Sequence, residues 1–283
     1  MTASTEHRLS LEHLAGALAL TRSANWNQNE ADWRTMLELG RAWGITASDG
    51  TLAASTLVIP YGTFAWVSMV LVAPEHRRKG YASQLLRTAI AYLRERKLTP
   101  LLDATPAGHE VYVHEGFRDT WGFRRLALKD GAAPAPGGGT GMIRPLEAKD
   151  WPQVLALDAP AFGASRERLL RTLAQRLPQA ALVAERGKEI TGYLLGRDGH
   201  EARQLGPLVA RDATAAQALL AVALSRVPAP LYVDVADHAP DVGTWLEARG
   251  FAFQRPFTRM VHGAQTAPGM ESRVVLVAGP ELG

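Results

Sequence analysis

Hydrophobic residues along the 283-residue chain follow two spacings, one typical of amphipathic helices and one typical of buried strands. The pattern in the first half predicts helices at 9–20, 30–39, 82–96 and 108–115, and strands at 42–47, 51–59, 64–72, 101–104 and 122–128. The clearest helix is 82–96, whose apolar face is formed by Leu85, Leu86, Ala89, Ile90 and Leu93. Alternating strands and helices indicate a mixed fold of the α/β (α+β) class.

The second half repeats the order of the first. Its pattern predicts helices at 151–157, 165–177, 213–225 and 242–249, and strands at 181–185, 190–196, 202–209, 231–235, 251–262 and 273–278. The closest echo lies between YVHEGF at 112–117 and WLEARGF at 245–251, each a short helix that ends in Gly-Phe. The repeated order indicates an internal duplication.

The two halves are joined by a stretch rich in Gly, Ala and Pro that has no apolar period. Such a composition cannot bury a core and is typical of a linker. The expected organisation is therefore a first domain at 1–130, a linker at 131–141 and a second domain at 142–283. Each domain is long enough to bury a core of its own.

Composition excludes several classes of protein. Apolar residues make up 47% and charged residues 21% of the chain, which is ordinary globular usage. The charge of 31 − 28 = +3 is shared between the halves, so no nucleic-acid binding is expected. The lack of cysteine rules out disulfides and a thiol nucleophile, and the histidine spacing predicts no metal site. No apolar run resembles a signal peptide or a membrane helix, so a cytoplasmic protein without a membrane partner is expected.

A basic turn after the strand at 64–72 is the clearest candidate for ligand binding. Three cations, Arg77, Arg78 and Lys79, precede Gly80 and the start of the long helix. Helix N-termini expose unpaired N–H groups that attract phosphate, and a glycine lets a ligand approach the backbone. The alternative is a solvated basic turn before an ordinary helix.

Residues 70–83 (VLVAPEHRRKGYAS) resemble the core motif of the GCN5-related N-acetyltransferases, [RQ]-x-x-G-x-[GA] after a strand that ends in V-x-P. The later Y-x-x-x-G-F at 112–117 is similar to the closing motif of that family. The resemblance implies tandem acyl-CoA N-acyltransferase folds, each a mostly antiparallel mixed sheet flanked by helices, with acetyl-CoA as cosubstrate. The implied cofactor contacts are Val70, Leu71 and Val72 for the pantetheine arm, and Arg77, Arg78, Lys79, Gly80, Tyr81, Ala82 and Ser83 around the pyrophosphate.

Within this resemblance, Tyr112 occupies the position of the general acid that protonates the departing thiolate. The alternative is a tyrosine that packs the short helix on the sheet. The base is left open: Asp103 acting through water, His109 close to Tyr112, or no dedicated base. Asp103 ordering a loop and His109 capping a helix are the structural alternatives for these two residues.

The resemblance implies that the loop and helix around residues 26–33 wall the acceptor pocket. Trp26, Asn27 and Trp33 would suit a small, partly apolar primary amine, and core packing is the alternative for Trp33. In the second half the matching turn at 206–216 has lost the glycine and keeps only Arg211, with Asp212 as a helix cap. The second domain is thus expected to be a degenerate copy.

The second domain is expected to buttress the first, with Asp234, His238 and Arg259 facing an acceptor pocket near the joint between the two. The strand at 273–278 is expected to complete the first sheet. Two alternatives to a small-molecule N-acetyltransferase stay open: a non-catalytic acyl-CoA-binding sensor and acetylation of a protein amine. The expected assembly is a monomer or a homodimer.

Overall fold

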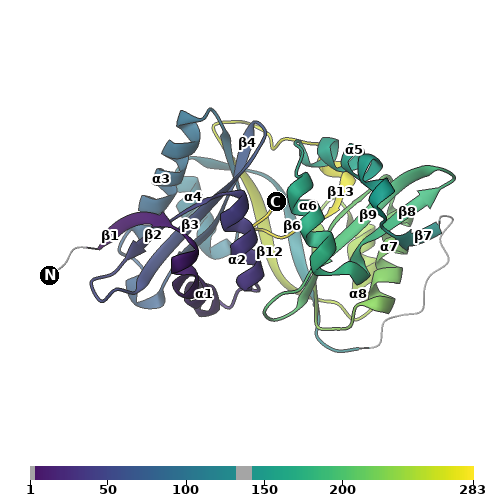
Figure 1. Ribbon diagram of the computed structural model, residues 1–283, viewed down its shortest axis with the longest axis horizontal. Coiled ribbons are helices and arrows are strands. Elements are labelled where there is room, and N and C mark those ends of the chain that lie inside the picture. Colours follow the sequence, from purple (N-terminus) through teal and green to yellow (C-terminus); the bar gives the residue numbers. More distant parts are fainter. Residues whose placement is uncertain (1–3, 132–141) are drawn as a thin grey trace. The chain divides into compact units, whose positions relative to one another are not determined.

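The computed structural model describes residues 4–131 and 142–283, so the linker expected at 131–141 lies outside the described residues except for Gly131. The chain forms two compact units. The first contains Met1–Thr120, Thr258–Ala267 and Pro280–Leu282, and the second contains Trp121–Phe257, Pro268–Gly279 and Gly283. In each unit, helices pack on a mixed and mostly antiparallel set of strands, as the sequence predicted (Figure 1).

The strands of the first unit follow the order of the chain except for the last. They are β1 (Thr5–Leu9), β2 (Arg41–Thr46), β3 (Leu52–Tyr61), β4 (Phe64–Val72), β5 (Thr99–Ala104) and the end of β12 (Ala252–His262). Strands β1 to β4 pair antiparallel, β4 and β5 pair parallel, and β5 and β12 pair antiparallel. The single parallel contact, β4 with β5, therefore lies in the interior of the sheet.

The helices of the first unit cover both faces of its sheet. They are α1 (Leu14–Ser23), α2 (Glu30–Leu39), α3 (Tyr81–Glu95) and α4 (Pro106–His114), with 3-10 turns η1 (Leu11–His13) and η2 (Pro74–His76). Leu86, Ala89 and Leu93 of α3 pack with Val67 of β4 in one buried cluster. Helices α1 and α2 cover the opposite face (Figure 1). The fold thus places different side chains above and below β4.

The prediction of a helix beginning at residue 9 is wrong. Residues 5–9 (TEHRL) form β1, and α1 begins at Leu14. Strand β1 pairs with β2 at the edge of the sheet, and Leu9 is its one buried residue. A polar edge strand carries little alternation of apolar and polar residues, so the sequence holds no strand signal at 5–9. The predicted helix therefore begins at residue 9, from the helical spacing of the leucines that follow.

The second unit repeats the order of the first. Its helices are α5 (Trp151–Phe162), α6 (Glu167–Arg176), α7 (Ala213–Arg226) and α8 (Pro240–Glu247), with 3-10 turns η3 (Ala148–Asp150), η4 (Pro178–Ala180) and η5 (Glu271–Arg273). Its strands lie in the order β6 (Phe117–Leu128), β11 (Leu231–Ala236), β13 (Val274–Leu276), β10 (Arg203–Ala210), β9 (Glu189–Arg197), β8 (Leu182–Arg186) and β7 (Met142–Pro145).

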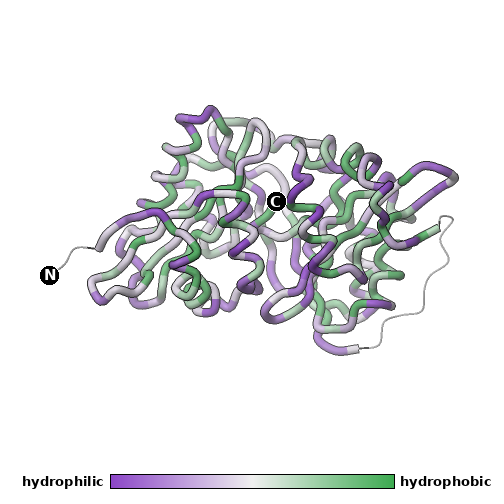
Figure 2. The backbone as a smooth tube through the Cα atoms, viewed as in Figure 1, coloured by the Kyte–Doolittle hydropathy of each residue, from purple (hydrophilic) through white to green (hydrophobic). Residues whose placement is uncertain are grey.

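The core of the second unit lies between its strands and the helices α7 and α8. Leu219 and Leu220 of α7 and Leu246 of α8 belong to one buried cluster with Leu205 and Val233 from the strands. Hydrophobic colour follows the strands in Figure 2, whereas the tip of the β8–β9 hairpin is hydrophilic. The opposite face of β9 carries Tyr193, whose hydroxyl donates to Asp158 of α5.

Each unit takes a strand end from the other half of the chain. Residues 258–262 of β12 belong to the first unit, where Thr258–Val261 pair with β5. Residues 121–128 of β6 belong to the second, where 123–128 pair with β11. The expectation that 273–278 completes the first sheet is wrong, because β13 pairs with β10 and β11 of the second unit. The compact units thus exchange strand ends, and the domain limits 1–130 and 142–283 stay a prediction.

The exchanged end of β12 is joined to β5 by a buried ion pair. Arg259 and Asp103 face each other in the strand register. Arg259 Nε donates to Asp103 Oδ1 at 2.9 Å and Nη2 donates to Oδ2 at 3.1 Å. The two side chains are 6% and 0% exposed, so their charges depend on each other and not on water.

Replacing one partner of this pair is expected to destabilise the protein strongly. Removing one member of a buried pair leaves an uncompensated charge and costs about 3–5 kcal/mol. We expect Arg259→Met and Asp103→Leu each to lower the free energy of unfolding by about this amount in urea titrations. The double variant should lose much less than the sum, and additive losses would contradict the coupling.

Candidate active site

A bulge in β4 shapes the candidate site of the first unit. Leu57 of β3 pairs with Ser68 and Ser55 pairs with Leu71, so three steps along β4 face two along β3. Met69 takes up the extra residue with a positive φ of 52°. Ser55 Oγ donates to the Met69 carbonyl at 2.8 Å. Bulges bend a strand and re-aim its backbone, and this one is held by a buried side chain.

The bulge coincides with the separation of β4 from β5. The two strands pair in parallel over Phe64–Trp66 and Thr99–Leu101, and within the described chain the pairing ends there. Beyond this point no ladder pairing joins 67–72 to 102–104 in the described residues, and we call this unpaired interval between the two strands the opening. Val70 and Val72 are half-buried along it. Unpaired strand edges present N–H and C=O groups to any extended ligand.

The turn after β4 leads to a helix N-terminus without a side-chain cap. Gly80 is the N-cap of α3, with a φ of 81°, and no side chain caps the first turn. A Cβ placed on Gly80 would meet nothing within 4 Å, so the turn is open on that side. Arg77, Arg78 and Lys79 are exposed around it. Open first-turn amides beside three cations form a site suited to a phosphate or pyrophosphate.

Ser83 differs from the other residues of this turn because its side chain is engaged. A hydrogen bond from Ser83 and, more strongly, the Arg87 guanidinium lower the pKa of Glu115 below its usual value. Arg87 Nε and Nη2 each donate to Glu115 at 2.8 Å. The contact expected of Ser83 therefore falls to its backbone amide.

Tyr112 lies on α4, on the side of the sheet that α3 covers, where it packs against the cluster of Val67 and Leu86. Its ring meets Phe117 edge to face at 6.1 Å. Burial raises the pKa of Tyr112 to about 12, so the phenol keeps its proton at neutral pH. A Cβ on Gly108 would lie 2.9 Å from Tyr112 Cε2, so glycine at this position gives the ring its place.

The two candidate bases lie in different surroundings. Asp103 is on β5, next in sequence to Leu102, which packs toward α3, and its carboxylate therefore points to the other face, where it binds Arg259. His109 lies one turn before Tyr112 on α4, and its Nε2 is 2.8 Å from Asp119 Oδ1. Only His109 shares an element with Tyr112, and the structure gives each candidate a charged partner.

The residues expected to wall an acceptor pocket are mostly covered. Trp33 is 0% exposed, and its Nε1 donates to Thr21 Oγ1 at 2.9 Å, so the structure places this ring in the core. Asn27 is 1% exposed, and Trp26 is half-buried. Asn29 is the N-cap of α2, where its Oδ1 accepts from the Asp32 N–H at 3.1 Å.

The second unit keeps the bulge but fills the opening. Leu205 and Leu208 of β10 pair with Gly196 and Leu194 of β9, which again leaves one extra residue on the bulged strand. Strands β10 and β11 pair in parallel at 203–205 with 231–233, and in the described residues their pairing ends there. Beyond this, β13 pairs with both of them. A segment of the chain itself therefore occupies the space that is open between β4 and β5.

The helix that follows β10 is also closed to anions. Asp212 is the N-cap of α7, and its Oδ1 accepts from the Ala215 N–H at 2.8 Å. Arg211 pairs with Glu189 at 2.5 Å. A carboxylate already occupies the end of the helix where a phosphate would bind, and it would repel one. The second unit thus differs from the first at this turn in both backbone and charge, and its description as a degenerate copy stays a prediction.

The other residues expected near an acceptor have clear structural partners. Asp234 is 0% exposed and accepts from Arg125 at 2.7 and 2.8 Å, and from Gln204 at 2.6 Å. His238 Nε2 lies 2.9 Å from the Val274 carbonyl of β13. These contacts assign both residues to the internal packing of the second unit.

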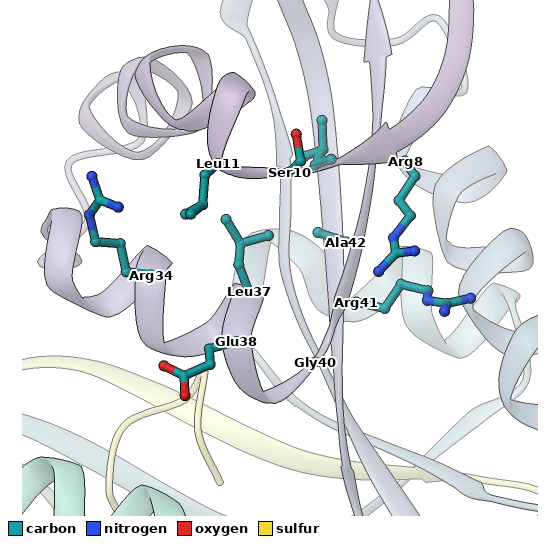
Figure 3. A pocket seen from close by; sticks show the side chains of 10 residues that line it. Arg8, Ser10, Leu11, Arg34, Leu37, Glu38, Gly40, Arg41 and Ala42 are labelled. Carbon is teal, nitrogen blue, oxygen red and sulfur yellow. The ribbon is translucent and has the colours of Figure 1, made fainter.

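A separate cleft of about 640 Å³ lies between β1, α2 and β2 of the first unit (Figure 3). Arg8 and Arg41 stand at one end, and Leu11 and Leu37 face each other nearer the other end. None of the residues predicted for the site is among those that line it.

Residues 4–131 and 142–283 contain no cluster of three or more potential metal ligands. In the same described part, no helix is long and apolar enough to cross a membrane.

Two family models match the chain, one in each sequence repeat. The model described as the Acetyltransferase (GNAT) family matches residues 13–118, and the model described as the Acetyltransferase (GNAT) domain matches residues 154–275. The matches cover the bulge, the basic turn and α4 in the first repeat, and β10, α7 and β11 in the second.

Relatives also match over most of the chain. The chain is 21% identical over 245 residues to YitH of Bacillus subtilis, an uncharacterized N-acetyltransferase. The match covers 86% of this chain and 86% of YitH. A putative acetyltransferase from Pyrococcus horikoshii has a similar structure, with a TM-score of 0.82 and 18% identity. The match covers 100% of this chain and 97% of that protein. The structure of a GCN5-related N-acetyltransferase from Sphaerobacter thermophilus is also similar, with a TM-score of 0.67 and 16% identity. The match covers 96% of this chain and 98% of that protein. These likenesses confirm the expected fold.

The capping role of Asp212 can be tested by stability. Asp212→Ala removes the acceptor for the Ala215 N–H and is expected to lower the free energy of unfolding by about 1 kcal/mol. Asp212→Asn keeps an acceptor at the same place and serves as the matched control. Thermal unfolding of the two variants should separate them, and equal losses would show that the charge and not the cap matters.

Proposed function

Because the chain belongs to the GNAT acetyltransferases, with one domain of that family in each half, we propose that it moves an acetyl group from acetyl-CoA to a primary amine of a small molecule. One observation carries the proposal. The first unit combines an open strand edge at β4 with an uncapped, basic N-terminus of α3, whereas the second unit has filled both positions. One acetyl-CoA site per chain, in the first unit, follows from this contrast.

The residues of the turn would hold the pyrophosphate. The backbone amides of about 78–83, with Arg77, Arg78 and Lys79 around them, fit a diphosphate because the helix end and the side chains add positive potential. Residues Val70 to Val72 of β4 would pair with the amides of the pantetheine arm through the strand edge that β5 leaves free. Both contacts would use backbone groups and would therefore depend little on which side chains stand at these positions.

When bound, acetyl-CoA supplies an activated acetyl thioester. The backbone N–H near Val70, re-aimed by the bulge, would polarise its carbonyl and stabilise the negative charge that develops on oxygen. Tyr112 would donate its proton to the sulfur as the C–S bond breaks. Its raised pKa suits a donor, because the phenol enters the reaction protonated at every physiological pH.

The proton of the amine has two candidate acceptors in the first unit. Asp103 lies on the face of the sheet opposite Tyr112, so it would meet an amine that attacks from the side away from the departing thiolate. His109, paired with Asp119, lies on the helix of Tyr112. Entry of neutral amine from solvent without a dedicated base is the third route. A cytoplasmic monomer or homodimer with Trp26 and Asn27 near the acceptor completes the proposal.

Charge at position 80 is expected to control cofactor affinity. Both Asp and Asn tolerate the left-handed backbone of Gly80, so Gly80→Asp and Gly80→Asn differ mainly by one negative charge. We expect the Asp variant to bind acetyl-CoA about tenfold more weakly than the Asn variant, since a carboxylate at a helix N-terminus repels phosphate by about 1 kcal/mol or more. Isothermal titration of acetyl-CoA measures both affinity and stoichiometry.

In that titration the wild type should bind one acetyl-CoA per chain. Equal affinities of the two variants, or two sites per chain, would contradict the assignment. Binding with no thiol release on any of a panel of amines would instead support an acyl-CoA sensor, and release only with peptide amines would support a protein acceptor.

Tyr112→Phe is expected to lower kcat by about 10²–10⁴-fold with little change in the KM for acetyl-CoA, because a positioned acid acts only in the transition state. The wild-type rate should not fall on the alkaline side until the pH nears the tyrosine pKa of about 12 or the fold is lost.

Gly108→Ala is the companion variant. It should keep or raise the stability of α4 while displacing the Tyr112 ring, and so lower kcat. An unchanged kcat in Tyr112→Phe would overturn the acid assignment.

A further inference from the structure

Ser68 is a buried hydroxyl on the bulged strand that no described contact explains. It is 7% exposed, and its Oγ has no hydrogen-bond partner in residues 4–131 and 142–283. It is the last β4 residue in register before the bulge at Met69. Because buried polar atoms in native proteins are nearly always paired, an unpaired one beside an opening points to a ligand.

Strand geometry places Ser68 in a polar row. It lies two residues from Trp66 and thus shares its face of the sheet. The Arg259 guanidinium is 4.4 Å from the centre of the Trp66 ring, and Arg259 binds Asp103. The parallel register pairs Trp66 with Leu101, and two further steps along both strands set Ser68 opposite Asp103 across the opening. The row therefore runs Ser68, Asp103, Arg259 over β4, β5 and β12.

The proposed acid lies on the other side of the same opening. Tyr112 packs with Val67 and Leu102, whose side chains point toward α3. Ser68 and Asp103, each the next residue along its strand, point away from α3. A thioester held in the opening would thus have the proton donor on one face of the sheet and the polar row on the other.

We propose, on the basis of the proposed acetyl transfer, that Ser68 positions the acceptor amine. A neutral primary amine has two N–H donors and one lone pair. Ser68 Oγ accepts one N–H, a carboxylate oxygen of Asp103 accepts the other in addition to its bond from Arg259, and the amine lone pair then points at the acetyl carbon. A secondary amine has only one N–H to offer, so this arrangement selects primary amines.

The chain offers a matched control in Thr56. Its Oγ1 is also buried and unpaired in the described part of the chain, and it lies on β3 of the same sheet. Thr56 lies two residues from both Ala54 and Val58, which pack toward α3, so it shares their face and points to the opposite face from Ser68. Removing the hydroxyl is therefore expected to affect stability in the same way at both positions. Of the two residues, Ser68 alone belongs to the polar row.

The experiment measures thiol release for wild type, Ser68→Ala, Ser68→Thr and Thr56→Val with a primary amine that the wild type accepts and with its N-methyl derivative. We expect Ser68→Ala to raise the KM for the primary amine about three- to tenfold, the fold-change of one lost hydrogen bond. Its KM for acetyl-CoA should stay unchanged, and its preference for the primary over the N-methyl amine should shrink. Ser68→Thr should restore both, and Thr56→Val should behave as the wild type.

The outcomes separate this inference from the function on which it rests. If the wild type acetylates no amine, both are overturned. If it does, and Ser68→Ala matches Thr56→Val in amine KM and in amine preference, only the role of Ser68 is overturned. The same holds if Ser68→Ala changes the KM for acetyl-CoA instead. Should Ser68→Ala fail to fold, Ser68→Cys keeps the volume with a weak acceptor and is expected to show the same two changes.

Discussion

The extra residue in β4 is the constraint on which the rest of the first unit depends. A parallel pair of strands normally continues its hydrogen bonds to the end of the shorter strand, and here it stops at Trp66 and Leu101. The bulge turns β4 away, and the Ser55 hydroxyl holds it by binding the Met69 carbonyl. Without that turn the strand edge would be covered by β5, and the chain would not arrive at Gly80 with an open helix end. The backbone thus creates the site, and the side chains refine it.

The two halves share a backbone geometry and differ at the candidate site. The bulge and the short parallel pairing occur in both. In the second unit β13 adds backbone partners to β10 and β11, and Asp212 satisfies an amide of α7 from within the chain. Each replacement turns an interaction available to a ligand into one made permanently by the protein. The second unit therefore gains internal hydrogen bonds where the first keeps groups available for binding.

Sequence reasoning reached the elements that local patterns control. The strand at 64–72 and the helix at 30–39 have the predicted bounds, because apolar runs and capping residues act over a few positions. It missed what depends on distant partners. Asp103 and Arg259 lie 156 residues apart, and no pattern in the sequence predicts that they pair. The polar strand β1 was missed for the same reason, since its pairing with β2 and not its composition makes it a strand.

The same limit applies within the candidate site. The motif around Gly80 is local and could be found from the sequence, whereas the polar row containing Ser68 exists only because three strands from distant parts of the chain lie side by side. A serine in an apolar strand has no distinguishing pattern until its neighbours across the sheet are known. Because a strand alternates its faces, the sheet itself separates Tyr112 from Asp103. Acid and amine would then act on opposite sides of one thioester, so the departing thiolate is protonated away from the incoming nucleophile.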